Sequence, residues 1–93
     1  MTKGKTKSGF EYKISDDALD DMELLDALAD MDDGAVTSYR YAIKALLGEE
    51  QRKALYEHVR DKNTGRVSAK EVFKAFTEIL MDAKERSAKT KNS

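Results

Sequence analysis

Several residue types with specialised chemistry are missing from this chain of 93 residues, or nearly so. It contains no cysteine, no proline and no tryptophan, and it has one histidine, His58. Without cysteine, neither a disulfide framework nor a thiolate metal site can form. Without proline, no helix loses a backbone N–H group at its centre. The composition therefore favours uninterrupted helices.

Long apolar segments are also missing. No run approaches the roughly 18 apolar residues that suggest a transmembrane helix. The lysine-rich start of the chain is not followed by the apolar stretch of a signal peptide. We therefore expect a cytoplasmic protein with no membrane partner.

Residues for catalysis or metal binding do not occur in recognisable combinations. His58 has no second histidine or cysteine with which to hold zinc, and no Gly-x-Ser-x-Gly motif or phosphate-binding glycine loop is present. Residues 61–71 resemble a calcium loop, but their glycine is fifth rather than sixth and their glutamate eleventh rather than twelfth. Lys62, Arg66 and Lys70 would oppose a cation there. We predict no enzymatic activity, no cofactor and no metal site.

Charge is distributed unevenly along the chain. Residues 1–13 carry a net charge of +3, residues 16–33 carry −9 and residues 34–93 carry +5, although the whole chain carries only −1. The acidic block would repel nucleic-acid phosphates, and Glu71 and Glu78 argue against a DNA-recognition helix near the end of the chain. We therefore expect no nucleic-acid partner. The acidic block itself has two interpretations: a solvated helix face, or a docking surface for a basic partner.

One short segment has the pattern of a β-strand. Phe10, Tyr12 and Ile14 alternate with polar residues, which is typical of a half-buried strand. No other segment is a good second strand by this criterion. We therefore expect residues 10–14 to lie on the helices as an extended arm, or to pair with the same segment of another subunit.

Four helices are predicted in the remainder of the chain. The first follows Ser15 as N-cap and ends at Gly34, and the second ends at Gly48, a residue suited to a C-cap. The third begins at Glu49. The fourth begins at a capping box of Ser68 and Glu71, with Val67 and Val72 as a hydrophobic staple. The apolar stripes are, in order, Leu19, Met22, Leu24, Leu25, Leu28 and Met31; Val36, Tyr39, Ile43, Leu46 and Leu47; Leu55, Tyr56 and Val59; and Val72, Phe73, Phe76, Ile79, Leu80 and Ala83.

These elements predict a mainly α fold, a small bundle of about four helices with an N-terminal extended or β arm. We expect a flexible basic segment at residues 1–9, a single helical domain at residues 10–86 and a flexible tail at residues 87–93. The candidate partner-binding residues are the arm residues Phe10, Tyr12 and Ile14, the aspartates Asp20, Asp21, Asp26 and Asp30, and Tyr41, which lies off the main stripe of its helix.

The order of short segments resembles that of the tail assembly chaperones of long-tailed, siphovirus-type phages and prophages of Gram-positive bacteria. No single motif is diagnostic, and the order and spacing carry the resemblance over nearly the whole chain. The segments are Ser8-Gly9-Phe10-Glu11-Tyr12, Asp20-Asp21-Met22-Glu23-Leu24-Leu25 with Leu28, Leu46-Leu47-Gly48-Glu49-Glu50-Gln51, Leu55-Tyr56-Glu57-His58-Val59-Arg60, Gly65-Arg66-Val67, the last helix, and Lys91-Asn92-Ser93.

The resemblance implies a function in virion assembly. Such proteins bind the long, aggregation-prone tape measure protein and keep it soluble until the tail tube forms. In many of these phages a ribosomal frameshift near the end of the gene produces a longer form that recruits the major tail tube protein. Thr90-Lys91-Asn92 can be encoded by a slippery sequence of that kind. The alternative function is that of a small prophage-encoded regulatory or adaptor protein that acts by protein–protein binding. Under either function, the chain could form a homo-oligomer through the arm.

Overall fold

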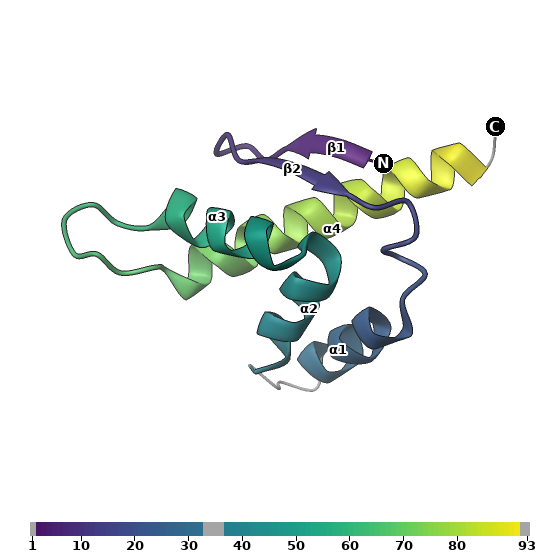
Figure 1. Cartoon of the computed structure of the whole chain (residues 1–93), viewed down its shortest axis with the longest axis horizontal. Helices are drawn as coiled ribbons and strands as arrows, with labels where there is room; N and C mark the ends of the chain where they lie inside the picture. Colours follow the sequence, from purple (N-terminus) through teal and green to yellow (C-terminus); the bar gives the residue numbers. More distant parts are fainter. Residues whose placement is uncertain (1, 33–36, 92–93) are drawn as a thin grey trace.

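A long C-terminal helix supports an N-terminal β-hairpin and three shorter helices (Figure 1). The structure is a computed structural model, and it describes residues 2–32 and 37–91. The elements are β1 (Thr2–Lys5), β2 (Glu11–Ile14), α1 (Met22–Asp32), α2 (Ser38–Leu47), α3 (Glu49–Val59) and α4 (Ala69–Lys91). The mainly α fold with an N-terminal strand is therefore confirmed.

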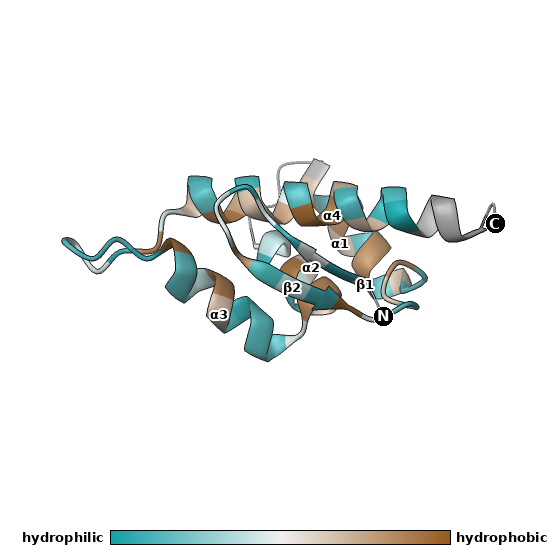
Figure 2. Ribbon diagram, turned by 90° about the horizontal axis from the view of Figure 1, so that it is seen from above, coloured by the Kyte–Doolittle hydropathy of each residue, from teal (hydrophilic) through white to brown (hydrophobic). Residues whose placement is uncertain are grey.

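The hydrophobic core is built from residues of all four helices and of the hairpin. α1 packs on α2, α2 packs on α3 and β2, and α4 packs on β1, α2 and α3. Figure 2 shows apolar bands on α4 facing these elements and hydrophilic bands facing away from them. The rings of Tyr39 on α2 and Phe73 on α4 stack with their centroids 3.8 Å apart. The largest fully buried side chains are Leu24, Ile43, Leu55, Phe76 and Ile79.

The strand at residues 11–14 has a partner within the same chain, so the prediction that no second strand exists is wrong. β1 and β2 form an antiparallel pair in which Gly4 lies opposite Tyr12. A turn around Thr6 joins them, where the Thr6 N–H donates to the Phe10 carbonyl at 2.9 Å and the Phe10 N–H donates to Thr6 Oγ1 at 3.1 Å. The hairpin thus begins inside the segment that we expected to be separate and flexible, residues 1–9.

The arm packs on the helices, as one of the two sequence interpretations proposed. Phe10, Tyr12 and Ile14 are all buried in the core. The turn of the hairpin is held by α3 and α4 as well. The Lys7 N–H donates to Glu78 Oε2 at 3.0 Å, and His58 Nε2 lies 3.2 Å from both the hydroxyl and the carbonyl oxygen of Ser8. Both strands are therefore part of the domain.

The first helix is shorter than predicted. Residues 16–19 form turns and α1 begins at Met22, where the Asp21 carboxylate accepts a hydrogen bond from the Glu23 N–H at 2.9 Å. Ser15 instead donates its hydroxyl hydrogen to Asp17. Aspartate competes well for such turns, which explains why the acidic segment does not begin as helix. The predicted end of this helix, Gly34, lies outside the described residues.

The predicted apolar stripe of the first helix is also wrong in part. Leu24 and Ala27 are buried and Leu28 and Met31 are partly buried, whereas Met22 and Leu25 are exposed. Residues 24, 27, 28 and 31 follow the period of an α-helix. A row of residues spaced by three drifts around the helix, and the predicted stripe therefore mixed two faces.

α3 begins at Glu49 and α4 follows the Ser68 cap, as predicted, and the described residues of the predicted apolar stripes of α2, α3 and α4 are buried or partly buried. Gly48 has a φ of +84° and its N–H donates to the Lys44 carbonyl at 2.8 Å, so it ends α2 as a C-cap. The Ser68 hydroxyl accepts the Glu71 N–H at 3.2 Å and caps α4. The C-terminal boundary differs, because the backbone of α4 remains helical to Lys91 and passes through the tail expected at residues 87–93. Val36 lies outside the described residues.

Candidate functional site

The outer face of α1 is an exposed apolar stripe bordered by carboxylates. Met22, Leu25 and Ala29 follow one another at helical spacing, and Asp26 and Asp30 lie beside them on the same face. All five side chains are exposed, with 67% of Met22 and 47% of Leu25 accessible. We call these five residues the α1 stripe. Exposed apolar side chains that adjoin one another and are bordered by charge are typical of binding surfaces.

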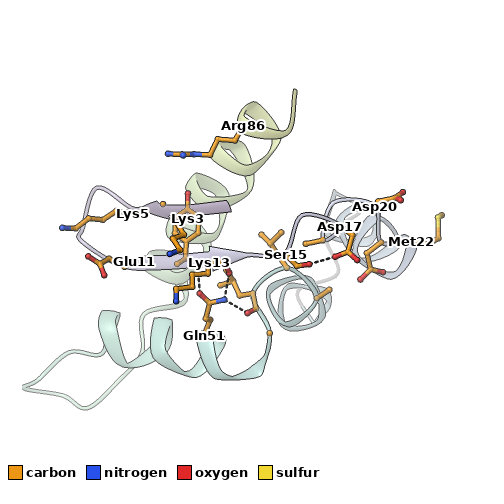
Figure 3. Close-up of a pocket in the computed structure, with 18 residues that line it drawn as sticks. Lys3, Lys5, Glu11, Lys13, Ser15, Asp17, Asp20, Met22, Gln51 and Arg86 are labelled. Carbon is orange, nitrogen blue, oxygen red and sulfur yellow. Dashed lines mark hydrogen bonds between the residues drawn. The ribbon is translucent and has the colours of Figure 1, made fainter. Parts of the chain in front are cut away.

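A second surface is an open groove of about 1460 Å³ between the hairpin and the turns that precede α1 (Figure 3). We call it the charged groove. Its lining also includes residues of α2, Leu46 and Leu47 among them. Its basic end is lined by Lys3, Lys5, Lys13 and Arg86, with Glu11 among them, and its acidic end is lined by Asp17, Asp20 and Asp21. Figure 3 shows the lysines on the strands and the aspartates away from them, beside Met22.

The edge of β2 that faces α3 is closed by a side chain. The Lys13 N–H donates to Gln51 Oε1 at 2.7 Å, and Gln51 Nε2 donates back to the Lys13 carbonyl at 2.6 Å. The same Nε2 donates to the Leu47 carbonyl at 2.6 Å. The carboxamide therefore takes the position that a peptide group of a third strand would occupy.

A hydrogen-bond network fixes the hairpin to α4 beneath the charged groove. The Tyr12 hydroxyl donates to the Asp82 carboxylate, which also accepts a hydrogen bond from Arg86 Nε at 2.9 Å. Burial of the phenol, reinforced by its hydrogen bond to Asp82, raises the pKa of Tyr12 well above its usual range. Tyr12 therefore stays neutral and acts as a donor at neutral pH.

The predicted partner-binding residues fall into two groups. Phe10, Tyr12 and Ile14 are 3–6% exposed, so the prediction that their side chains contact a partner is not supported by their position in the core. The remaining candidates can be reached from solvent. Asp20 and Asp21 line the charged groove, Asp26 and Asp30 belong to the α1 stripe, and Tyr41 is 69% exposed on α2.

Sequence reasoning missed the apolar half of the α1 stripe and the basic end of the charged groove. The predicted stripe includes Met22 and Leu25, although residues 24, 27, 28 and 31 form a separate row with helical period that leaves these two on another face. Lys3 was placed in a flexible segment. The sequence around Lys3 shows no local pattern that would predict a strand there.

Within residues 2–32 and 37–91, no group of three or more histidine, aspartate or glutamate side chains is arranged to hold a metal ion. The Asp61 carboxylate of the segment that resembles a calcium loop accepts the Asn63 N–H at 2.7 Å and the Thr64 N–H at 3.1 Å. It therefore serves a turn. None of the described helices is both long and apolar enough to span a bilayer.

Comparisons of the chain with models of protein families, with curated proteins and with solved structures found no match. The features of this chain that bear on its function are therefore the α1 stripe, the charged groove and the resemblance described above.

Proposed function

We propose that this protein is a phage tail assembly chaperone that acts in the bacterial cytoplasm, where it binds the tape measure protein and keeps it soluble until the tail tube forms. The observation that carries the proposal is the α1 stripe. It offers two large apolar side chains, Met22 and Leu25, to solvent on a helix that also has a second, buried apolar face. A helix with two apolar faces can pack on its own core and on another helix at the same time.

The chemistry of the α1 stripe fits a long amphipathic helix. Such a helix would place its apolar residues against Met22 and Leu25, and basic residues beside them would meet Asp26 and Asp30. Carboxylates at the border would speed encounter with a basic partner and disfavour an acidic one. A tape measure protein is a long helical chain with many apolar segments, which is the kind of partner that this surface suits. The function involves binding and release without catalysis.

Co-expression with the tape measure protein of the same genome tests the proposal. We expect that protein to move from the insoluble to the soluble fraction and to co-purify with a tagged form of this chain. Leu25→Ser should weaken the complex, because truncating an apolar anchor at the centre of an interface costs about 1–3 kcal/mol. Met81→Ser is the matched control, since Met81 is 63% exposed on α4 and lies outside the α1 stripe.

The double variant Asp26→Asn/Asp30→Asn tests the charged border separately. It should make binding weaker and less sensitive to salt, with little change in folding, because both carboxylates are exposed. If neither Leu25→Ser nor Asp26→Asn/Asp30→Asn reduced co-purification of the tape measure protein, the role of α1 would be refuted. A tape measure protein that stays insoluble with the wild-type chain would refute the function. The gene order provides an independent check. A downstream gene that encodes a very long helical protein would favour the chaperone function over that of a regulatory or adaptor protein.

A further inference from the structure

The basic end of the charged groove contains a cross-strand pair of like charge. Lys3 lies directly opposite Lys13 in the sheet. The backbone N–H and carbonyl of Lys13 bond to Gln51 and so face away from β1. The two lysines therefore form a non-hydrogen-bonded pair, in which the Cα atoms are only about 4.5 Å apart and the side chains are closest. Like charges in that arrangement destabilise a sheet.

The neighbouring pair on the same face shows the contrast. Lys5 lies opposite Glu11, and these two charges are opposite in sign. Among the described residues, no carboxylate forms an ion pair with Lys3 or Lys13. An unpaired cationic pair on a flat strand face is therefore available to an anionic group from outside the chain.

The acidic end of the groove carries an excess of negative charge. Asp17, Asp20 and Asp21 lie close in sequence and line one wall, and no basic residue occurs between Ser15 and Asp33. Asp17 and Asp21 already accept hydrogen bonds within the turns, from Ser15 and from the Glu23 N–H. The exposed Asp20 carboxylate has no such bond among the described residues. The acidic end is therefore suited to bind a cationic group, and the basic end is suited to bind an anionic group.

We propose that two copies of this chain associate face to face through the charged groove about a two-fold axis, so that the basic end of each groove meets the acidic end of the other. A surface with opposite charges at its two ends is complementary to itself after a rotation of 180°. One contact then neutralises both ends in both copies. A nucleic acid or a uniformly acidic peptide fits less well, because Asp17, Asp20 and Asp21 would repel it from the same groove.

The proposed dimer is weak and sensitive to salt. Exposed ion pairs contribute little individually, and their attraction is screened beyond about 10 Å at 0.1 M ionic strength. We expect the dimer in sedimentation-velocity experiments on the full chain at low salt, with a mass that rises with protein concentration and levels off at twice the monomer mass. We expect its Kd to rise at least about tenfold between about 0.05 M and about 0.5 M salt.

Charge reversal provides the decisive test. Lys3→Glu/Lys13→Glu reverses the charge of the cross-strand pair at the basic end, where Lys5 and Arg86 remain, and Asp20→Lys reverses the charge of the exposed carboxylate at the acidic end. Each variant alone should raise the Kd about tenfold or more, because like charges then face each other across the two-fold axis. An equimolar mixture of the two variants should restore the dimer. The matched control for the lysine pair is Lys62→Glu/Lys70→Glu, which changes net charge by the same amount as Lys3→Glu/Lys13→Glu at exposed positions outside the groove and should associate as the wild type does.

Three results would overturn the proposal. They are a wild-type chain that remains monomeric at millimolar concentration, a mass that grows beyond two copies, and a mixture of reversed variants that stays monomeric although circular dichroism shows both to be folded. The two proposals share Met22, which lines the charged groove as well as the α1 stripe, but they can be tested separately. Lys3, Lys13 and Asp20 lie outside the α1 stripe, and Leu25 does not line the charged groove. Leu25→Ser should therefore dimerise as the wild type does while losing tape measure protein, and a failure of one proposal can be distinguished from a failure of the other.

Discussion

Gly4 lies directly opposite Tyr12 in the two-stranded sheet, and its missing side chain leaves the space that the Tyr12 phenol occupies. A methyl group at Gly4 would come within 2.5 Å of the ring carbon that carries the hydroxyl, and within 2.9 Å of Asp82 Oδ2. Both groups belong to the hydrogen-bond network that fixes the hairpin to α4. The glycine is therefore required by the close approach of the Tyr12 ring and the Asp82 carboxylate to the β1 backbone, rather than by an unusual backbone conformation.

Gly4→Ala should destabilise the fold through this contact. The tyrosine or the strand must move to admit the methyl group, and overpacking of this kind costs about 1–3 kcal/mol. Chemical denaturation measures the loss as a lower midpoint. Lys5→Ala is the control, since Lys5 is the next residue of β1 and its side chain is exposed. Equal midpoints for Gly4→Ala and Lys5→Ala would show that the Tyr12 ring does not pack against Gly4 as closely as described.

The raised pKa of Tyr12 predicts a loss of stability in alkali. The folded state holds this phenolic proton more tightly than the unfolded chain, whose tyrosine pKa is about 10. The contribution is therefore fully present below about pH 10 and is lost as the pH rises through the pKa of the folded state. One such group lowers the free energy of unfolding by at most about 1.4 kcal/mol per pH unit.

Tyr12→Phe should separate this effect from other alkaline effects. The variant loses a hydrogen bond to a charged group, which costs about 1.5–3 kcal/mol at neutral pH. Asp82 keeps its bond to Arg86. Between about pH 10 and pH 11, the stability of the variant should fall less steeply than that of the wild type, because the variant has no proton to lose at this position. Parallel curves would mean that the Tyr12 hydroxyl is not buried against Asp82.

The sequence was sufficient to predict most of the helices. In α2, α3 and α4 the buried residues recur with helical period, and Gly48 and Ser68 mark two boundaries with side-chain or backbone chemistry of their own. Such signals are local, so the sequence of one segment is enough to predict that the segment forms a helix and where the helix begins or ends. The same holds for β2, where Phe10, Tyr12 and Ile14 alternate with exposed residues.

The hairpin and the charged groove could not be predicted in the same way. β1 contains Thr2, Lys3, Gly4 and Lys5, which show no apolar alternation, and the strand forms because β2 and α4 provide partners for it. Gly4 reads as a strand breaker until its contact with Tyr12 is known. Likewise, the separation of Lys3 from Asp20 within one groove depends on tertiary packing, because 17 positions separate them in sequence.

Ser68→Ala tests the beginning of α4. The hydroxyl of Ser68 accepts the Glu71 N–H at 3.2 Å, and loss of such a cap costs about 0.5–2 kcal/mol. A lower midpoint in chemical denaturation should reveal it, with an unchanged dependence on denaturant concentration. Ser68→Asp is the control, because aspartate is also a good N-cap and should retain most of the stability. An alanine variant as stable as the wild type would place the start of α4 elsewhere.

The last prediction concerns the edge of β2 that Gln51 closes. Gln51→Ala removes the carboxamide that pairs with the N–H and carbonyl of Lys13, and it leaves both backbone groups to solvent. Each lost hydrogen bond of this kind costs about 0.5–1.5 kcal/mol, so the fold should be destabilised by about 1–3 kcal/mol. Amide hydrogen exchange at Lys13 should accelerate more than exchange at Tyr12, whose N–H faces β1 because neighbouring residues of a strand bond to opposite sides. Lys53→Ala, at an exposed position two residues further along α3, should leave exchange at Lys13 unchanged. If Gln51→Ala and Lys53→Ala gave the same exchange rate at Lys13, the carboxamide would not be the group that protects this edge, and the open strand would have to be protected by another side chain.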